Sequence, residues 1–167
     1  MPVDVSNIYF REAVTGDVPE IQRVRNSVLE NRLSDPALVP DSDVMDYIFR
    51  RGNGWVCGFG NKLVGFSIIS IIDKNVWALF IEPGFERAGI GRQLHDIMLN
   101  WYFRQSKETL WLSTSPGTRA ELFYRNAGWN ETGLYGKTEI KFEMTWSGWM
   151  TKNKNTFRGK IRDLKQL

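Results

Sequence analysis

The sequence predicts an α+β fold in which a mixed, mostly antiparallel central sheet is flanked by about four helices. Strand-length apolar runs follow one another in the middle of the chain and again near its end, and segments with helical spacing separate these groups. A chain of 167 residues with a hydrophobic share of 42% is long enough to bury one core. We therefore expect one domain over residues 1–150, followed by a basic tail over residues 151–167.

The first third of the chain reads as one strand and two helices. Residues 8–13 are predicted to form a strand, and an acidic cap with a proline behind it begins a helix at Asp17. The apolar face of this helix consists of Val18, Ile21, Val24, Val28 and Leu29. Residues 31–40 contain two prolines and are expected to form a loop, after which Asp41 or Ser42 caps a short second helix.

Three strands are predicted next, and short polar turns join them in the manner of antiparallel hairpins, over residues 54–59, 63–72 and 76–81. A helix over residues 89–105 carries one apolar stripe. The remaining elements are a short strand, a helix that begins with a capping box, and a closing pair of strands, over residues 110–114, 118–127, 130–134 and 139–145.

The composition excludes several classes of protein. No apolar run approaches the roughly 20 residues that span a bilayer, and the first residues lack the basic and apolar regions of a signal peptide. Cys57 is the only cysteine and His95 the only histidine, so no internal disulfide can form and we expect no metal site. A single cysteine is typical of a reducing compartment, and the expected location is cytoplasmic.

The net charge of +3 and the isoelectric point of about 9.1 come from the end of the chain. Six basic residues follow position 151, and only Asp163 opposes them. The rest of the chain is slightly acidic, so the basic surplus indicates a solvated tail. We expect no nucleic-acid partner and no membrane partner.

Residues 80–94 carry most of the functional information. An apolar strand ends at Phe80-Ile81, and a loop of small residues then leads into a helix. The free N–H groups at a helix N-terminus are typical of a phosphate site, and Gly89 and Gly91 allow close approach to the main chain. Two common motifs do not fit, because Leu94 stands where a dinucleotide-binding loop needs its third glycine, and no P-loop lysine follows the glycines.

Glu86-Arg87-Ala88-Gly89-Ile90-Gly91 resembles the Gln/Arg-x-x-Gly-x-Gly/Ala signature of the GNAT superfamily of acyl-CoA-dependent N-acetyltransferases. The block over residues 118–129, which contains Phe123-Tyr124 and ends in Gly128-Trp129, resembles a second motif of that family, and the order of elements over residues 8–145 matches as well. Glu86 departs from the signature, and we expect its carboxylate to point outward.

The resemblance implies that acetyl-CoA is the cofactor. Its pantetheine would lie along a strand that splays from its neighbour, and its pyrophosphate would bind main-chain N–H groups at the helix start. The implied cofactor-binding residues are Phe80, Ile81, Arg87, Ala88, Gly89, Ile90, Gly91 and Arg92. Tyr124 matches the tyrosine that many members use as the general acid for the leaving thiolate. No general base is identified, with Glu82 and Glu30 as the two candidates considered.

The expected reaction is direct transfer of the acetyl group to a primary amine, most simply of a small molecule. Trp77 and Arg32 are the candidate substrate-binding residues, Arg32 because its guanidinium can pair with a carboxylate. Two alternatives stay open: a non-catalytic acyl-CoA-binding or regulatory module of the same fold, and an acetyltransferase for protein N-termini or lysines. Trp146 and Trp149 follow the last strand and are candidates for an apolar contact in a homodimer.

Overall fold

A seven-stranded sheet forms the centre of the computed structural model, which describes residues 4–30 and 32–153. The strand order is β1-β2-β3-β4-β5-β7-β6. The strands are β1 (Ile8–Glu12), β2 (Gly52–Phe59), β3 (Lys62–Ser70), β4 (Asn75–Ile81), β5 (Leu110–Thr114), β6 (Asn130–Tyr135) and β7 (Glu139–Met144). Every neighbouring pair is antiparallel except β4 and β5. The predicted mixed, mostly antiparallel sheet is confirmed.

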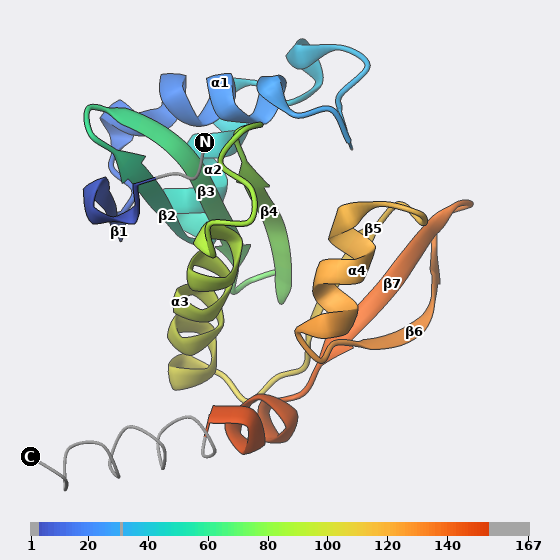
Figure 1. Ribbon diagram of the computed structural model, residues 1–167. Helices are drawn as coiled ribbons and strands as arrows, with labels where there is room; N and C mark the ends of the chain where they lie inside the picture. The colour runs from blue at the N-terminus through green and yellow to red at the C-terminus, as the bar shows by residue number, and fades with distance from the viewer. Residues whose placement is uncertain (1–3, 31, 154–167) are drawn as a thin grey trace, which may run out of the picture.

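Helices cover both faces of the sheet, and each face has its own core (Figure 1). On one face lie α1 (Val18–Ser27), α2 (Asp41–Asp46) and a π-helical turn that continues α2, η4 (Tyr47–Arg51). On the other face lie α3 (Ile90–Gln105) and α4 (Arg119–Asn126). Burial of the apolar stripes of α1 and α3 against the sheet is the main force that fixes these layers.

The start of α1 differs from the expectation in its chemistry. Asp17 does precede the helix, but its carboxylate makes no capping hydrogen bond. It accepts two hydrogen bonds from the Arg11 guanidinium, at 2.7 and 2.9 Å, and one from the Val14 N–H group. A charge-assisted, bidentate pair is stronger than a single cap bond, so the aspartate ties β1 to α1 instead.

The end of the described chain is helical, since residues 146–153 continue from β7 as a helix. Trp149 lies in this segment with only 4% of its surface exposed, and its indole N–H donates to Asn100 Oδ1 at 3.0 Å. It is therefore a core residue of its own chain and not an exposed apolar patch for a homodimer. Trp146 is partly buried against the same core. The expected boundary at residue 150 falls inside this helix, and residues 154–167 of the expected tail lie outside the described residues.

The parallel pair β4–β5 is joined at one point only. Asn75 is opposite Trp111, and the Trp111 main-chain N–H donates to Lys74 O at 3.0 Å. Beyond Asn75 the two strands diverge, so the rest of β4 pairs with no strand on that side within the described residues. Figure 1 shows the two wings of the sheet spreading apart, with β1 to β4 in one and β5 to β7 in the other.

A β-bulge in β4 changes the direction of its side chains. Val76 pairs with Ile69 and Ala78 pairs with Ile68, which leaves Trp77 as the extra residue. Trp77 and Phe80 consequently pack with the core of the α1 face, whereas Leu79 and Ile81 pack on the α3 side. The divergent part of β4 thus presents aromatic side chains to one face and aliphatic ones to the other.

Candidate active site

A cavity of about 480 Å³ lies where β4 has diverged from β5. Its walls are the end of β4 (Leu79, Phe80 and Ile81), the loop and first turn of α3, the first two turns of α4, and residues 28–30 after α1. Because parallel strands normally pair along their length, this opening in the sheet needs the specific divergence described above. The cavity brings together segments that are distant in the sequence.

The first turn of α3 presents main-chain donors to this cavity. Gly89 is the N-cap residue, has a φ of +77°, and supplies no side-chain cap. The first hydrogen bond into the helix is from Gln93 N–H to Gly89 O, at 3.1 Å. The N–H groups of Ile90, Gly91 and Arg92 therefore have no main-chain partner within the described residues. Together with the dipole of a 16-residue helix, these donors form a site that suits a phosphate group.

Two glycines keep this site open. A Cβ atom on Gly89 would meet no heavy atom within 4 Å, and one on Gly91 would only touch Phe123 and Ile81 at 3.7 and 3.8 Å. Side chains at these positions would therefore extend into the cavity and fill it. The loop also contains Arg87 with a φ of +65°, a conformation that costs a non-glycine residue about 1 kcal/mol or more.

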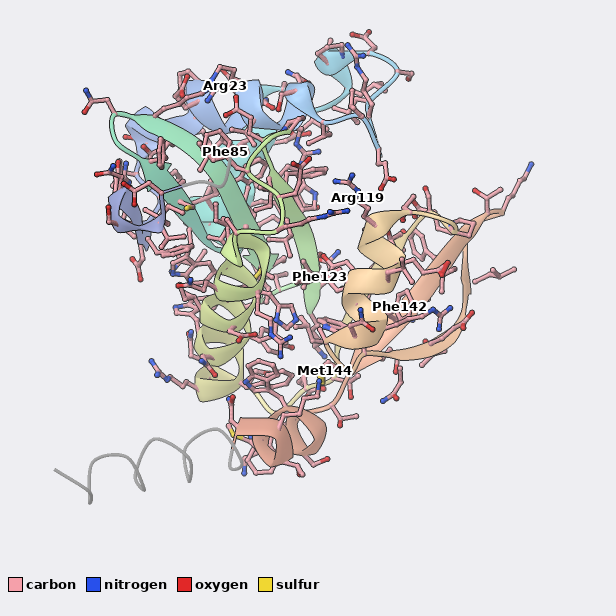
Figure 2. The ribbon with its side chains drawn as sticks, in the orientation of Figure 1. Arg23, Phe85, Arg119, Phe123, Phe142 and Met144 are labelled. Carbon is pink, nitrogen blue, oxygen red and sulfur yellow. The ribbon has the colours of Figure 1, made fainter. Side chains whose placement is uncertain are left out.

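Glu86, the departure from the family signature, lines the cavity and does not point away from it. Its Oε2 accepts a hydrogen bond from Gly84 N–H at 2.7 Å, and its Oε1 lies 3.4 Å from Arg119 Nη1. Figure 2 shows Arg119 between α4 and the loop that precedes α3. The carboxylate thus shapes the loop and contacts a cation on the opposite wing, which offsets part of its charge near the phosphate site.

The carboxylates of both candidate bases, Glu82 and Glu30, contact other residues of the protein. Glu82 is buried and forms ion pairs with Arg23 and Lys62, so its charge holds β4 to α1 and β3. Glu30 does line the cavity, but its Oε2 accepts a hydrogen bond from the Arg119 N–H at 2.8 Å, in the first turn of α4. Each of these contacts has a structural role, and of the two carboxylates only that of Glu30 lines the cavity.

Tyr124 comes from α4 and lines the cavity. Its ring is enclosed by His95, Phe123, Trp129 and Phe142, and only 7% of the residue is exposed. Its hydroxyl has no hydrogen-bond partner within the described part of the chain. Burial raises the pKa of Tyr124 well above its usual value, because the phenolate would be poorly solvated. The hydroxyl therefore keeps its proton at neutral pH and is able to donate it.

His95 holds the two wings together. Its ring is 1% exposed, and its Nε2 accepts a hydrogen bond from the Trp129 indole N–H at 2.9 Å. Since an acceptor nitrogen carries no proton, the ring proton is on Nδ1, which lies 2.8 Å from Asp96 Oδ1. Both nitrogens are engaged, so His95 is a structural link between α3 and the segment after α4.

The structure brings together most of the residues predicted for the site. Phe80, Ile81, Arg87, Gly89, Ile90, Gly91, Arg92 and Tyr124 all line the cavity. Ala88, Trp77 and Arg32 do not, and Arg32 is exposed in the loop after α1. Trp77 stacks on Tyr47 with a centroid distance of 4.2 Å. It lies on the α1 face, next to Phe80.

Several residues of the cavity wall were not predicted from the sequence. Arg119, Ala120 and Phe123 share one face of α4 with Tyr124, and their spacing at three and four residues would have indicated this. Figure 2 shows Phe123 between α3 and α4. Phe85 reaches the cavity from a loop, where no periodic pattern gives such a signal. Glu30, which the sequence offered as a candidate base, lines the cavity from the segment after α1.

The sequence matches the Acetyltransferase (GNAT) family over residues 21–129, which is more than half of the chain. The chain belongs to this family. A comparison with curated protein sequences gives no significant match. The family match includes the loop before α3 and the whole of α4, so all residues that line the cavity lie in the part of the chain that matches the family.

Solved structures of other GNAT proteins have the same fold. The PaiA N-acetyltransferase from Thermoplasma acidophilum, in complex with coenzyme A, is 15% identical with a TM-score of 0.72 over 83% of this chain and 98% of that chain. A GNAT acetyltransferase from Staphylococcus aureus Mu50 is 18% identical with a TM-score of 0.72, over 83% and 99%. The ribosomal-protein-S18-alanine N-acetyltransferase from Escherichia coli is 18% identical with a TM-score of 0.65, over 82% and 91%.

The described part of the chain contains no helix that is long and apolar enough to cross a membrane.

Cys57, the single thiol, is fully buried on β2, and burial raises its pKa to about 11. The thiol is therefore protonated and enclosed at neutral pH, as expected for a core residue.

Proposed function

We propose that this GNAT protein is an N-acetyltransferase that transfers the acetyl group of acetyl-CoA directly to a primary amine, in the reducing environment of the cytoplasm. The observation that carries the proposal is that the unpartnered N–H groups of α3 and the unused hydroxyl of Tyr124 line one cavity in the opened sheet. The first group of atoms suits a pyrophosphate, and the second suits proton donation.

The N–H groups of Ile90, Gly91 and Arg92 hold the pyrophosphate, with the guanidinium groups of Arg87 and Arg92 near the same charge. The unpaired edge of β4 offers main-chain groups that can pair with the two amides of pantetheine as an added strand would. The fit is supported by the open space at Gly89 and Gly91, where side chains would obstruct a bound phosphate.

Acetyl-CoA supplies an activated acyl group when it is bound. Main-chain N–H groups near Phe80 stabilise the negative charge that develops on the acyl oxygen as the amine nitrogen bonds to the carbonyl carbon. Tyr124 donates its proton to the sulfur as the carbon–sulfur bond breaks, and it regains a proton from solvent. The amine gives up its own proton to solvent. Tyr124 is in the form that this step needs, because the phenol is protonated at neutral pH and only the protonated phenol can act as the acid.

The acceptor amine enters from the α1 face, opposite the phosphate site. Phe80 connects the two sides, since it lines the cavity and also packs in the core cluster beneath α1. The 480 Å³ cavity is of the size that small-molecule sites have, which suits its use by the cofactor. We take the acceptor to be the primary amine of a small molecule, and a protein N-terminus or lysine is the alternative.

Replacing Gly91 with leucine tests the cofactor site. The new side chain extends between Phe123 and Ile81 into the cavity, so acetyl-CoA affinity measured by calorimetry is expected to fall at least about tenfold. Gly16→Leu is the matched control, because a Cβ there meets nothing within 4 Å and Gly16 does not line the cavity. Wild-type protein that binds no acyl-CoA, or two variants with equal affinity, would contradict the proposal.

A further inference from the structure

Arg25 on α1 is a buried arginine whose charge has no counterpart. Only 8% of the residue is exposed, and no carboxylate pairs with it within the described residues. Its Nε and Nη2 atoms are enclosed and make no hydrogen bond. The other arginine of this helix, Arg23, binds Glu20, Glu82 and a main-chain carbonyl. The missing partner is thus a property of Arg25 and not of its helix.

Aromatic rings surround the Arg25 guanidinium, and no carboxylate of the described residues pairs with it. The group lies 4.7 Å from the centre of the Trp77 ring and 5.1 Å from that of Phe80. Trp77 is in turn stacked on Tyr47 with an interplanar angle of 9°. Such cation–π contacts stabilise the faces of the guanidinium plane, but they leave the N–H groups at its edges unpaired.

Without a bound anion, the burial of the unpaired Arg25 charge costs free energy of folding. Burial without a counter-charge lowers the pKa of Arg25 to about 10, so the group stays cationic at neutral pH and carries the full desolvation penalty. Buried arginines are normally paired, because each unpaired donor in a charged group is costly. The enclosed edge is suited to an anion that the protein itself does not supply.

The position of Arg25 relates it to the cavity. Phe80 lines the cavity and also packs over the guanidinium, so only one ring separates the two. Val28, one helical turn after Arg25, lines the cavity as well. Arg25 itself does not line the cavity, so an acceptor bound on the α1 side of Phe80, as proposed above, would lie next to Arg25 with this one ring between its carboxylate site and the cavity. Arg32, to which the sequence assigned a substrate carboxylate, is exposed in the following loop.

We propose that Arg25 is the carboxylate-binding residue of the acceptor site, so that the amine substrate is a small amino acid or a related amine that carries a carboxylate. The inference rests on the proposed acetyltransferase function. Of the two nitrogens at the end of the planar guanidinium fork, Nη1 is the one that is not enclosed, so it is the donor that a ligand can reach. A carboxylate accepts a charge-assisted hydrogen bond from Nη1 that a neutral amide cannot match in strength. The aromatic rings keep the fork oriented, and Nε and Nη2 stay enclosed.

The test compares matched pairs of acceptors with wild type and with Arg25→Gln. The panel contains α-, β- and γ-amino acids, each beside its carboxamide, and the rate of thiol release gives kcat/KM. We expect the kcat/KM of wild type to be on the order of 100-fold higher for one of the acids than for its amide. In Arg25→Gln the kcat/KM for the acid should fall to that for the amide, and the value for the amide should not change. Arg25→Lys keeps the charge but lacks the fork, so it should retain only part of the preference for the acid.

Two controls separate this proposal from its alternatives. Acetyl-CoA affinity must be the same in wild type and Arg25→Gln, since a loss of cofactor binding would assign Arg25 to another role and overturn the proposal. Arg50→Gln repeats the substitution at an arginine whose side chain is 84% exposed, and it should change nothing. Turnover without any preference for the acids, or a preference that survives in Arg25→Gln, overturns the carboxylate site and leaves the acetyltransferase function intact.

If the protein binds acetyl-CoA but releases no thiol with any amine, the acetyltransferase function itself is refuted. The carboxylate site is then decided by calorimetric titration of the same acids and amides into the CoA-bound protein. Binding of an acid that Arg25→Gln abolishes supports the site, and equal binding of acid and amide overturns it.

Discussion

Tyr124 combines an enclosed ring with a hydroxyl that the fold does not use. Four aromatic neighbours hold the ring, while the hydroxyl has no partner in the described chain. A tyrosine kept only for packing could be a phenylalanine without loss, because an unpaired polar atom in a largely buried residue contributes nothing to stability. The hydroxyl is therefore available for the proton donation that we propose for it.

Replacement of Tyr124 by phenylalanine should separate these two properties. We expect kcat to fall about 100-fold or more, because a positioned general acid typically contributes that much. Acetyl-CoA affinity and the melting temperature should stay close to the wild-type values, since the packing is retained. Steady-state kinetics, calorimetry and thermal unfolding are the measurements, and an unchanged kcat would exclude Tyr124 as the acid.

At single positions, the sequence identifies residues that belong to a local motif. Gly89, Gly91 and Tyr124 were predicted from motif spacing, and all three line the cavity. Arg25 was not predicted, because its burial and its lack of a partner depend on α1, β4 and the bulge at Trp77 together. A helix sequence with two nearby arginines does not reveal which of them finds a carboxylate.

One hydrogen bond between two buried side chains, Trp129 and His95, joins α3 to the segment after α4, in addition to the packing of their rings. We expect Trp129→Phe to lower the free energy of unfolding by about 2 to 4 kcal/mol, because it leaves His95 Nε2 unpaired and also creates a cavity. Urea unfolding at neutral pH provides the measurement.

Trp101→Phe is the matched control for this change. Trp101 is partly buried against the same core and makes an edge contact with Trp55 at 5.6 Å, but its indole N–H has no partner in the described chain. Trp101→Phe should lower the free energy of unfolding by less, about 1 kcal/mol. Equal losses in the two variants would show that packing, and not the hydrogen bond, connects the elements.

Most elements were predictable because their periodicity and turns are local properties. Strand β5 has the predicted bounds, and α3 begins one residue later than expected and ends where expected. The helical residues 146–153 were missed because lysines and a threonine after Trp149 read as the start of a polar tail. That segment is helical while Trp149 packs in the core, which is a tertiary effect that helix propensity does not include.

At the scale of the whole molecule, two arginine–aspartate ion pairs connect different elements of the fold. Arg11 holds Asp17 between β1 and α1, and Arg51 holds Asp73 at the turn between β3 and β4. The hydrogen bonds from these arginines lower the pKa of both aspartates below the usual value near 4. A carboxyl whose pKa is lower in the folded state stabilises the fold above its unfolded-state pKa, and this stabilisation disappears as the pH falls through the folded-state pKa.

Asp17→Asn should therefore destabilise the protein in a pH-dependent way. At pH 7 we expect a loss of about 1 to 2 kcal/mol, and the difference from wild type should shrink as the pH is lowered from about 5 to below about 3. Urea titrations across this range measure it. Glu12→Gln, at an exposed β1 position without an ion pair in the described chain, should show no such dependence. A loss at pH 7 that persists unchanged in acid would contradict the assignment.

The arrangement of the wings is the part that only the three-dimensional structure supplies. The family resemblance implied a splayed strand, and the single β4–β5 pair confirms the divergence. The sequence could not indicate that Glu86 and Glu30 both reach Arg119 across the cavity, because these contacts join residues from both wings. Long-range pairings of this kind depend on the final packing and leave no local pattern.

The open side of β4 also has a consequence for how the protein behaves in a test tube. Its sequence, Asn-Val-Trp-Ala-Leu-Phe-Ile, has no charge and no proline, and β-branched and aromatic residues are frequent in it. Such a segment with unpaired main-chain groups is a template on which another extended chain can add, so it favours aggregation. A ligand that pairs with this edge covers the template. Bound coenzyme would then act as a solubility factor for the protein, in addition to the role in acetyl transfer that we propose for it.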